Sequence, residues 1–409
     1  MDEHPQARFI VETLASAGFV AYYAGGWVRD LLLNHPSDDI DIATNASPEI
    51  VQALFPHTIP IGLAFGIILV IIEGRQYEVA TFRQDLDYKD GRRPTKIEFT
   101  TAVEDAKRRD FTINGMFYDP LKEQILDFVG GKEDLDKKLI SAIGDPHKRI
   151  QEDRLRMIRA IRLACRFSFK IEKNTELAIR SHVKELFPAV AIERVWQEFK
   201  KSHDFGYLRS TLIHLHEFGL LQEIFPALNG IELSKIKERL EPIKDYPQKA
   251  PVIASILALF LDTTLDEQQQ LCKTLKLSNS DLSFTTFLYH ARTLTQLDRP
   301  VERIEWGYFY ANVFAPVCLQ IISTHMPARK RVTFLKEHET QMQILETSIQ
   351  RIKKQDPIIK SDDLKKLGIE PSPLMGQLLQ EAERISINEQ IYEPALILKR
   401  LRELSIWPK

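Results

Sequence analysis

The sequence predicts an α+β protein: a mixed β-sheet with helices forms the N-terminal part, and the rest is all-helical. Short β-rich runs separated by turns occupy residues 1 to about 140. From Pro146 onward strand patterns nearly vanish, and helical periodicity with short connectors takes their place. A length of 409 residues allows two to four domains. We expect an α+β head (1–140), a helical neck (141–220), and a helical body and tail (221–409).

The composition is that of an ordinary globular protein, with 27% charged and 44% hydrophobic residues. Cys165, Cys272 and Cys318 lie far apart without a CxxC pair, so neither a disulfide framework nor a zinc site is expected. The first residues lack the order of a signal peptide, and no run of about eighteen apolar residues could span a bilayer. These features predict a cytoplasmic protein with no membrane partner. The net charge of −2 does not decide for or against nucleic acid.

The chain begins with an amphipathic helical pattern, and the β-rich runs follow it. In order they are residues 19–25, 39–44, 65–74, 77–83, 96–101 and 124–130. The continuous apolar run IILVII, residues 67–72, predicts a strand buried on both faces. The strand after it would pair with it through a turn at residues 73–76. The main helical runs are residues 153–167, 174–187, 193–202, 207–221, 250–261 and 330–355.

Two acids alternate with isoleucines in the stretch SDDIDIAT, residues 37–44. Because side chains alternate between the faces of a strand, Asp39 and Asp41 would share one face, and Ile40 and Ile42 would be buried on the other. Two neighbouring carboxylates repel each other unless a cation, an arginine or a proton lies between them. The pattern alone is also compatible with an acidic strand edge.

The stretch YAGGWVRDLLL, residues 23–33, stands just before the acids. Gly25 and Gly26 follow a strand-like run and precede a helix, so the backbone there can approach an anion at the helix N-terminus. Arg29 adds a charged group suited to phosphate. Phosphate donors and metal-binding carboxylates within seventeen residues predict a site at which two Mg²⁺ ions assist the displacement of pyrophosphate by a hydroxyl.

A row of charges follows on the helix predicted to begin at Glu152. At about 100° per residue, one side of this helix is apolar. The neighbouring side carries Asp153, Arg156, Arg159, Arg162 and Arg166. So many arginines on one face favour a bound anion, although a solvated basic face would show the same pattern.

The stretch GGWVRDLLLNHPSDDIDIAT resembles the signature of the class II tRNA nucleotidyltransferases (CCA-adding enzymes) and the bacterial poly(A) polymerases. The resemblance continues through residues 108–120, 152–167 and 191–201, and a weaker similarity lies at 363–383. Two positions depart from the family pattern: Gly115 replaces the usual alanine, and Ala191 replaces a serine that would cap the following helix.

The resemblance implies a role for each matching residue. Asp39 and Asp41 would hold two Mg²⁺ ions and carry the catalysis, with Glu78 as a possible third carboxylate. Asp153 and Arg156 would pair with the edge of the incoming base, accepting from an exocyclic amine and donating to the ring, which selects C and A over U and G. The remaining nucleotide-binding positions would be Gly25, Gly26, Arg29, Arg109, Asp110, Arg159 and Arg162.

The implied activity is addition of CCA, or part of it, to tRNA 3′ ends from CTP and ATP. The glycine-containing stretch at residues 59–66 resembles the CCA-adding form, whereas a poly(A) polymerase would carry a basic run there. Poly(A) addition remains the alternative, and a non-catalytic RNA-binding relative is a third reading. The tRNA acceptor stem would lie on the helical part, with residues 197–209 and 325–336 as candidate basic and aromatic contacts. No protein partner is predicted.

The segment DLDYKDGRRP, residues 85–94, contains Asp90 and Gly91, which are strong turn formers. We expect a mobile loop here, and an exposed hairpin is the other interpretation. The resemblance implies that this element helps the enzyme pass from C addition to A addition.

Overall fold

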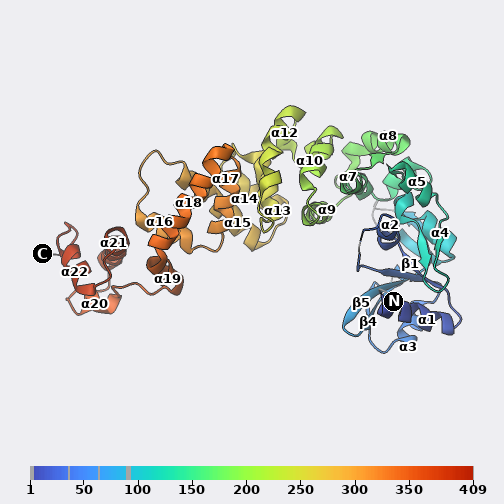
Figure 1. The fold of residues 1–409 in the computed structure, drawn as a ribbon, viewed down its shortest axis with the longest axis horizontal. Coiled ribbons are helices and arrows are strands. Elements are labelled where there is room, and N and C mark those ends of the chain that lie inside the picture. Colours follow the sequence, from blue (N-terminus) through green and yellow to red (C-terminus); the bar gives the residue numbers. More distant parts are fainter. Residues whose placement is uncertain (1–3, 36, 63–64, 89–93, 409) are drawn as a thin grey trace. The chain divides into compact units, whose positions relative to one another are not determined.

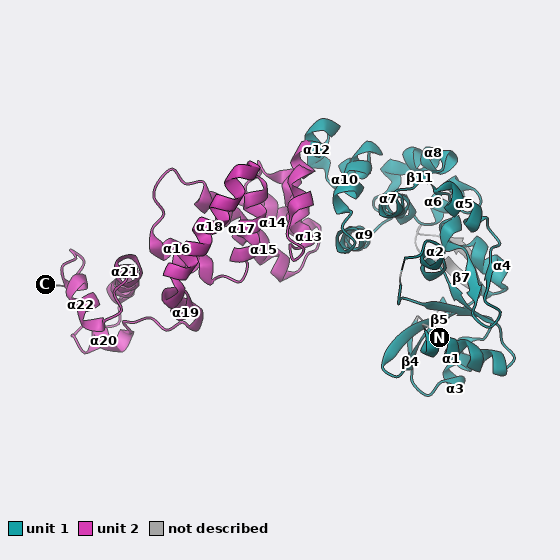
Figure 2. Ribbon diagram, viewed as in Figure 1, with its two compact units in different colours: residues 1–237 teal, residues 238–409 magenta. Residues whose placement is uncertain are grey.

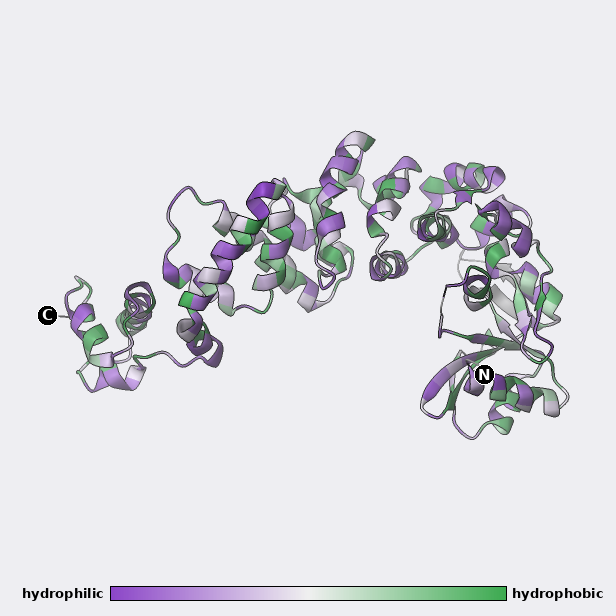
Figure 3. Cartoon of the chain, viewed as in Figure 1, coloured by the Kyte–Doolittle hydropathy of each residue, from purple (hydrophilic) through white to green (hydrophobic). Residues whose placement is uncertain are grey.

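The computed structural model describes residues 4–35, 37–62, 65–88 and 94–408. It divides into two compact units, residues 1–237 and 238–409 (Figure 2). Each unit contains its own cluster of buried hydrophobic side chains. Most helices carry hydrophobic and hydrophilic residues on different sides, as Figure 3 shows, so each helix can bury one stripe and leave the other to solvent. In the described residues no helix is both long and apolar enough to cross a membrane.

The first unit begins with helix α1 (Pro5–Ser16) (Figure 1). Seven of its described strands form a mixed sheet in the order β3-β4-β5-β2-β1-β8-β9. The strands are β1 (Ala21–Ala24), β2 (Asp41–Thr44), β3 (Thr58–Gly62), β4 (Ile67–Ile72), β5 (Arg75–Thr81), β8 (Phe117–Asp119) and β9 (Gln124–Leu126). The helices along this part of the chain are α2 (Gly26–Leu32), α3 (Pro48–Leu54), α4 (Ala102–Lys107), the 3₁₀ helix η2 (Thr112–Asn114) and α5 (Gly131–Lys137). The predicted mixed sheet with helices is confirmed.

The register of the sheet brings the acidic strand to its centre. β1 pairs antiparallel with β2 and with β8, so Ala24 lies between Asp41 and Phe117. β2 pairs parallel with β5, where Ile42 faces Val79. Asp41 therefore neighbours Glu78, one position earlier on each strand. The sheet thus joins two carboxylates that are 37 positions apart in the sequence.

The rest of the first unit is helical except for a short parallel pair, β10 (Leu139–Ile140) and β11 (Lys170–Ile171). Helix α7 packs against α9 and α10. The helices here are α6 (Pro146–Glu152), α7 (Leu155–Phe167), α8 (Lys173–His182), α9 (Ile192–Asp204), α10 (Leu208–Glu217), α11 (Leu220–Ile224) and α12 (Leu233–Leu240). The last of these crosses the division between the two units. The 3₁₀ helices η3 (Val183–Glu185) and η4 (Pro226–Leu228) lie among them.

The second unit is all-helical in its described residues. Its α-helices are α13 (Val252–Leu257), α14 (Leu265–Thr274), α15 (Asn279–Thr295), α16 (Arg303–Ala311), α17 (Ala315–Thr324), α18 (Ala328–Ile344), α19 (Glu346–Lys354), α20 (Ser361–Lys365), α21 (Pro373–Glu389) and α22 (Pro394–Arg402). The 3₁₀ helices are η5 (Glu241–Asp245) and η6 (Ala258–Phe260). Reciprocal capping boxes start α14 at Thr264 and α15 at Ser278, where each cap side chain accepts a backbone N–H of the first turn.

Three local predictions need correction. In IILVII only Ile68 and Val70 are fully buried, because β4 packs one face on the core and leaves the other partly open. The helix predicted over 330–355 is broken at the buried Leu345, and α19 packs against α16.

The third correction concerns residues 85–94. Their described ends belong to the antiparallel pair β6 (Arg83–Tyr88) and β7 (Pro94–Phe99). The segment is therefore a hairpin at its base and not a loop throughout, because the flanking residues satisfy their backbone groups by pairing with each other. Its tip, residues 89–93, lies outside the described residues, including Asp90 and Gly91.

Candidate active site

The glycine pair forms the turn between β1 and α2. Gly25 has a φ of +69° and precedes the first residue of α2. A Cβ on Gly25 would lie 3.1 Å from Nη1 of Arg109, and one on Gly26 would lie 3.4 Å from Nη2 of Arg29. Glycine therefore lets two guanidinium groups approach the backbone at a helix N-terminus, where anions are favoured.

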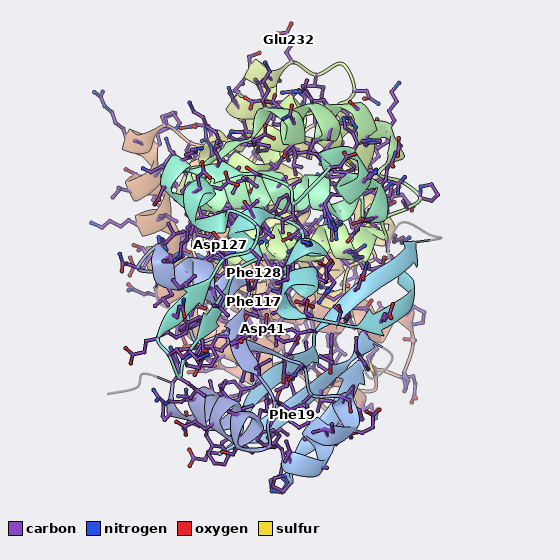
Figure 4. The ribbon with its side chains drawn as sticks, turned by 90° about the vertical axis from the view of Figure 1, so that its right-hand side faces the viewer. Phe19, Asp41, Phe117, Asp127, Phe128 and Glu232 are labelled. Atoms are coloured by element: carbon purple, nitrogen blue, oxygen red, sulfur yellow. The ribbon has the colours of Figure 1, made fainter. Side chains whose placement is uncertain are left out.

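The acid pair lies beside this turn with the alternation that the sequence predicts. Ile40 and Ile42 are buried, whereas Asp39 and Asp41 are reached by solvent. Asp39 precedes the first residue of β2, so only Asp41 belongs to the strand itself. Asp41 and Phe117, both labelled in Figure 4, pair with Ala24 of β1 from opposite sides. The guanidinium of Arg109 stands 4.9 Å from the centre of the Phe117 ring.

The pKa of Asp41 reflects the charges that surround its carboxylate. Desolvation in the pocket, together with the charges of Glu78 and Asp39, raises this pKa to about 6, although the charge of Arg109 opposes the rise. Because Asp41 keeps a solvent-exposed side, the repulsion between carboxylates is the part of the shift that a bound cation would relieve. Within the described ranges no three acidic, histidine or cysteine side chains stand close enough to be recognised as a metal site. The oxygen donors present nevertheless suit Mg²⁺, which keeps several waters and needs only one or two carboxylates.

A pocket of about 530 Å³ opens beside these residues. It unites ten of the predicted site residues: Gly25, Gly26, Arg29, Asp41, Arg109, Asp110, Asp153, Arg156, Arg159 and Arg162. Asp39 and Glu78, the candidate third carboxylate, are not among its lining residues. Sequence reasoning did not assign the further lining residues Arg83, Arg108, Asn114, Leu163, Arg166 and Lys201. Among the described residues of the lining, eight arginines and one lysine face three aspartates, so the pocket suits a polyanion.

Some of these residues did carry a signal in the sequence. Arg166 belongs to the predicted row of charges, Arg108 to the doublet before Asp110, and Lys201 to a basic stretch. Asn114 belongs to the stretch 108–120 that carries the resemblance, although no role was assigned to it. Arg83 carried no signal, because its approach to the pocket depends on distant segments. Nη1 of Arg83 donates to the backbone oxygen of Phe65.

Buried acids hold the arginines of the pocket. Asp30 accepts from Nε and Nη2 of Arg29 at 2.9 and 2.8 Å. Asp110 accepts from Nη2 of Arg159 at 2.6 Å and from Nδ2 of Asn114 at 3.0 Å. Burial opposes ionisation of Asp110, but the charge and hydrogen bond of Arg159, the hydrogen bond from Asn114 and the charge of Arg156 together outweigh it. They hold the pKa of this carboxyl well below its usual range. Asp110 thus positions other side chains and has little capacity left for a nucleotide.

Asp105, on α4, plays the same part for two more arginines. Its carboxylate is 1% exposed and accepts from Arg108 at 2.7 Å and from Arg109 at 3.0 Å. It also accepts the backbone N–H of Arg83 at 3.2 Å. Burial would raise the pKa of Asp105, but the charges of Arg109 and Arg108 lower it below the usual value. The three arginines around this carboxylate all line the pocket.

The residues predicted to read the base belong to different elements. Asp153 lies outside α7, between α6 and α7, and its position on the charged face of one continuous helix was predicted wrongly. Its extended backbone lets the side chain accept the N–H of Leu155 at 3.1 Å, so the aspartate starts the next helix rather than continuing the first. Asp153 also accepts two bonds from Arg194, whereas Arg156 bonds to Glu152 at 2.6 Å.

The two departures from the family pattern have structural consequences. Ala191 precedes α9 without any side-chain cap, as predicted. At Gly115 a Cβ would lie 2.6 Å from Val129 and 3.0 Å from Ile143, so this chain has no room for alanine there unless its neighbours shift.

Parts of the chain match known protein families. Residues 21–141 match the family model described as Poly A polymerase head domain, and residues 168–231 match the one described as Probable RNA and SrmB- binding site of polymerase A. A CCA-adding enzyme of Enterococcus faecalis is 31% identical over 94% of this chain and 91% of the relative. One of Leuconostoc citreum is 33% identical over 98% of this chain and 96% of the relative.

Solved structures show the same fold along the whole chain. The CCA-adding enzyme of Bacillus stearothermophilus in complex with CTP has a TM-score of 0.79 and 27% identity, over 98% of both chains. That of Thermotoga maritima complexed with tRNA has a TM-score of 0.65 at 18% identity over 96% of this chain and 93% of that one, which shows the fold alone. The sequence relatives cover nearly all of the chain, so this protein belongs to the family of CCA-adding enzymes, the tRNA nucleotidyltransferases.

Proposed function

We propose that this chain completes the 3′ end of tRNA by adding C and A from CTP and ATP. The observation that carries the proposal is the pocket itself, in which the turn at Gly25 and Gly26, the carboxylate of Asp41 and the arginines of α7 meet. The poly(A) alternative is not favoured, because the relatives that match the chain along its length are CCA-adding enzymes.

The reaction is a nucleotidyl transfer to a hydroxyl. The 3′ oxygen of the RNA forms a bond to the α-phosphorus of the nucleotide, the bond to the bridging oxygen breaks, and pyrophosphate leaves. Asp39 and Asp41, with Glu78 beside them, would hold two Mg²⁺ ions. When bound, such ions favour ionisation of the attacking hydroxyl and stabilise charge on the leaving group.

The protein's own side chains supply phosphate binding and orientation. The turn at the start of α2 and Arg29 would face the triphosphate, and Arg109, which lines the same pocket, would add a second guanidinium. Because Asp30 and Asp105 hold these arginines before any ligand arrives, little side-chain entropy is lost when the triphosphate binds.

Base selection is assigned to Asp153 and Arg156. C and A both carry an exocyclic amine that can donate a hydrogen bond to the carboxylate of Asp153, whereas U and G present a carbonyl at that place. A wrong base would leave polar groups of the pocket without partners, which such a site penalises strongly. Arg159 and Arg162 extend the same face, and Glu198 holds Nε of Arg162 at 2.5 Å.

The tRNA would contact the helical parts of both units, including the candidate stretches 197–209 and 325–336. The division into a head (1–140), a neck (141–220) and a body and tail (221–409) is part of this proposal. The cytoplasmic location and the role of residues 85–94 in A addition stay predictions.

The decisive experiment supplies purified protein with tRNA ending at the discriminator base, at C or at CC, and with labelled CTP or ATP. We expect stepwise completion of CCA and no further growth. An unstructured oligonucleotide serves as the control. Long A tails on that oligonucleotide would overturn the proposal in favour of poly(A) addition, and no incorporation into any RNA would favour a non-catalytic relative.

A further inference from the structure

Phe205 is an exposed aromatic residue at the rim of the nucleotide pocket. It is the residue at which α9 ends, and 60% of its surface is exposed. The guanidinium of Arg166, which lines the pocket, stands 4.5 Å from the centre of the Phe205 ring. Lys201, one helical turn earlier on α9, also lines the pocket. An apolar ring therefore borders a strongly basic cavity.

The backbone holds this ring in a defined position. After α9 ends, the N–H of Gly206 donates to the carbonyl of His203 and the N–H of Tyr207 donates to that of Ser202, both at 2.9 Å. Gly206 has a φ of +79°. This is the Schellman arrangement, in which a left-handed residue ends the helix and both flanking residues are fixed. The exposure of Phe205 is thus built into a rigid turn.

The surroundings of the ring connect it to the arginines of α7. The Tyr207 ring stacks on Phe205 with centroids 6.3 Å apart and 14° between the planes. The Tyr207 hydroxyl accepts from Nη1 of Arg162 at 3.5 Å. The guanidinium of Arg166 stands 4.8 Å from the centre of the Phe167 ring and 4.5 Å from that of the Phe205 ring, and it pairs with Asp30 at 3.1 Å.

An exposed phenylalanine forgoes the stabilisation that burial would give it. A bound nucleic acid would explain why this ring stands beside cationic groups. Nucleobases stack on aromatic side chains, and lysine and arginine contact the adjoining phosphates. Lys201 is exposed and one turn away, so it can contact a phosphate of the same strand. The chemistry of the rim therefore matches a single strand of nucleic acid.

The base in question is not that of the incoming nucleotide. Arg156 is assigned to that base, and Arg166 lies ten residues further along α7, about 15 Å at 1.5 Å per residue. This separation exceeds the width of a nucleobase. We propose that Phe205, supported by Tyr207, is a stacking platform for a nucleobase of the acceptor RNA strand close to its growing 3′ end, an inference that rests on the proposed function.

The test compares Phe205→Trp, Phe205→Leu and Phe205→Ala in the full chain. Leucine keeps an apolar side chain without a π face, and tryptophan keeps the π face. We expect alanine and leucine to raise the KM for tRNA by about 5- to 150-fold, as loss of one stacked base does, and tryptophan to stay near wild type. The KM values for CTP and ATP should not change. Phe9→Ala, on the exposed side of α1, is the matched control and should leave every constant unchanged.

A second readout does not depend on turnover. A tRNA with 2-aminopurine as its 3′-terminal base should lose fluorescence on binding to the wild type and to Phe205→Trp, because stacking quenches it. The quench should be smaller with Phe205→Ala and Phe205→Leu at saturating protein. An equal quench in all variants, or a raised KM for CTP and ATP alone, would overturn the platform. If the wild type shows the quench but adds no nucleotide, the proposed function fails while the platform stands.

Discussion

Arg194 holds the carboxylate of Asp153 with both of its terminal nitrogens, at 3.0 Å to Oδ1 and 2.6 Å to Oδ2. Arg194 belongs to α9, whereas Asp153 lies at the break between α6 and α7. The bond therefore fixes the acid assigned to base reading from a second helix. Charge-assisted two-point contacts of this kind set orientation as well as attraction.

Replacing Arg194 by Gln should loosen Asp153 and reduce discrimination between bases. We expect the ratio of kcat/KM for CTP over UTP to fall by about 5- to 150-fold, because about 1–3 kcal/mol of orientation is lost. Arg194→Lys keeps the charge but only one contact. Its CTP-over-UTP ratio should therefore lie between those of the wild type and Arg194→Gln. The measurement is misincorporation on tRNA ending at the discriminator base. An unchanged ratio in both variants would show that Asp153 needs no support from α9.

Replacing Asp39 or Asp41 by Asn should abolish nucleotide addition in the presence of Mg²⁺, because one carboxylate cannot hold two metal ions. Thermal stability should not fall, since the substitution removes a charge from a repulsive cluster. Binding of tRNA, measured by filter retention, should persist. Asp38→Asn, at an exposed neighbouring position, is the matched control and should stay active. Near-normal turnover in either site variant would mean that the metal ligands lie elsewhere.

Replacing Arg156 by Ala should damage base choice more than triphosphate binding. The change removes the donor to the base edge and leaves the phosphate side at Arg29 and Arg109 intact. UTP and GTP should then compete better with CTP, as steady-state competition assays would measure. A uniform loss across all four nucleotides would refute the role in base reading.

Asp105→Asn should show the opposite pattern. The variant leaves Arg108 and Arg109 without their shared carboxylate, which should lower the free energy of unfolding. We expect a loss of about 2–3 kcal/mol, less than for a fully buried pair, because water still reaches both arginines. The KM for CTP and for ATP should rise together, with the ratio between them unchanged. Thermal melts and parallel kinetics measure both effects. A change in base preference would contradict a role limited to phosphate binding.

His338 predicts a pH dependence of stability in the second unit. It is 7% exposed, contacts the rings of Trp306 and Phe334, and lies 2.7 Å from the Tyr310 hydroxyl. Burial lowers its pKa to about 4 from an ordinary value near 6.5. Because the pKa is lower in the folded state, the stability that the neutral His338 contributes is fully present above pH 6.5. It is lost as the pH falls toward 4.

The loss through His338 amounts to at most about 3 kcal/mol. His338→Asn, which retains an N–H donor for Tyr310, should flatten the fall of the melting temperature between pH 6.5 and 4. Melts of both proteins across this range check the prediction, with pH 7.5 as the reference. Parallel curves would show that other groups cause the acid sensitivity.

Much of the site could be predicted because its signals repeat within one segment. The alternation of Asp39 and Asp41 with isoleucines has the period of a strand, and the arginines of α7 have the period of a helix. The break before α7 could not be read from this pattern, since an aspartate that caps a helix fits the same charged row as one inside it. Leu345 is a similar case, where packing against a neighbouring helix interrupts a continuous helical pattern.

The α+β order, the glycine turn, the acidic strand and the basic face of α7 could all be read from local sequence, because each depends on the chemistry of neighbouring residues. Which distant groups meet depends instead on how the elements pack. Glu78 comes beside Asp41 through the parallel pairing of β5 and β2, and Arg194 reaches Asp153 across 41 positions. Phe205 stands at the rim because α9 ends against Arg166. Such contacts leave no periodic trace in either segment, since they arise from the packing of complete elements.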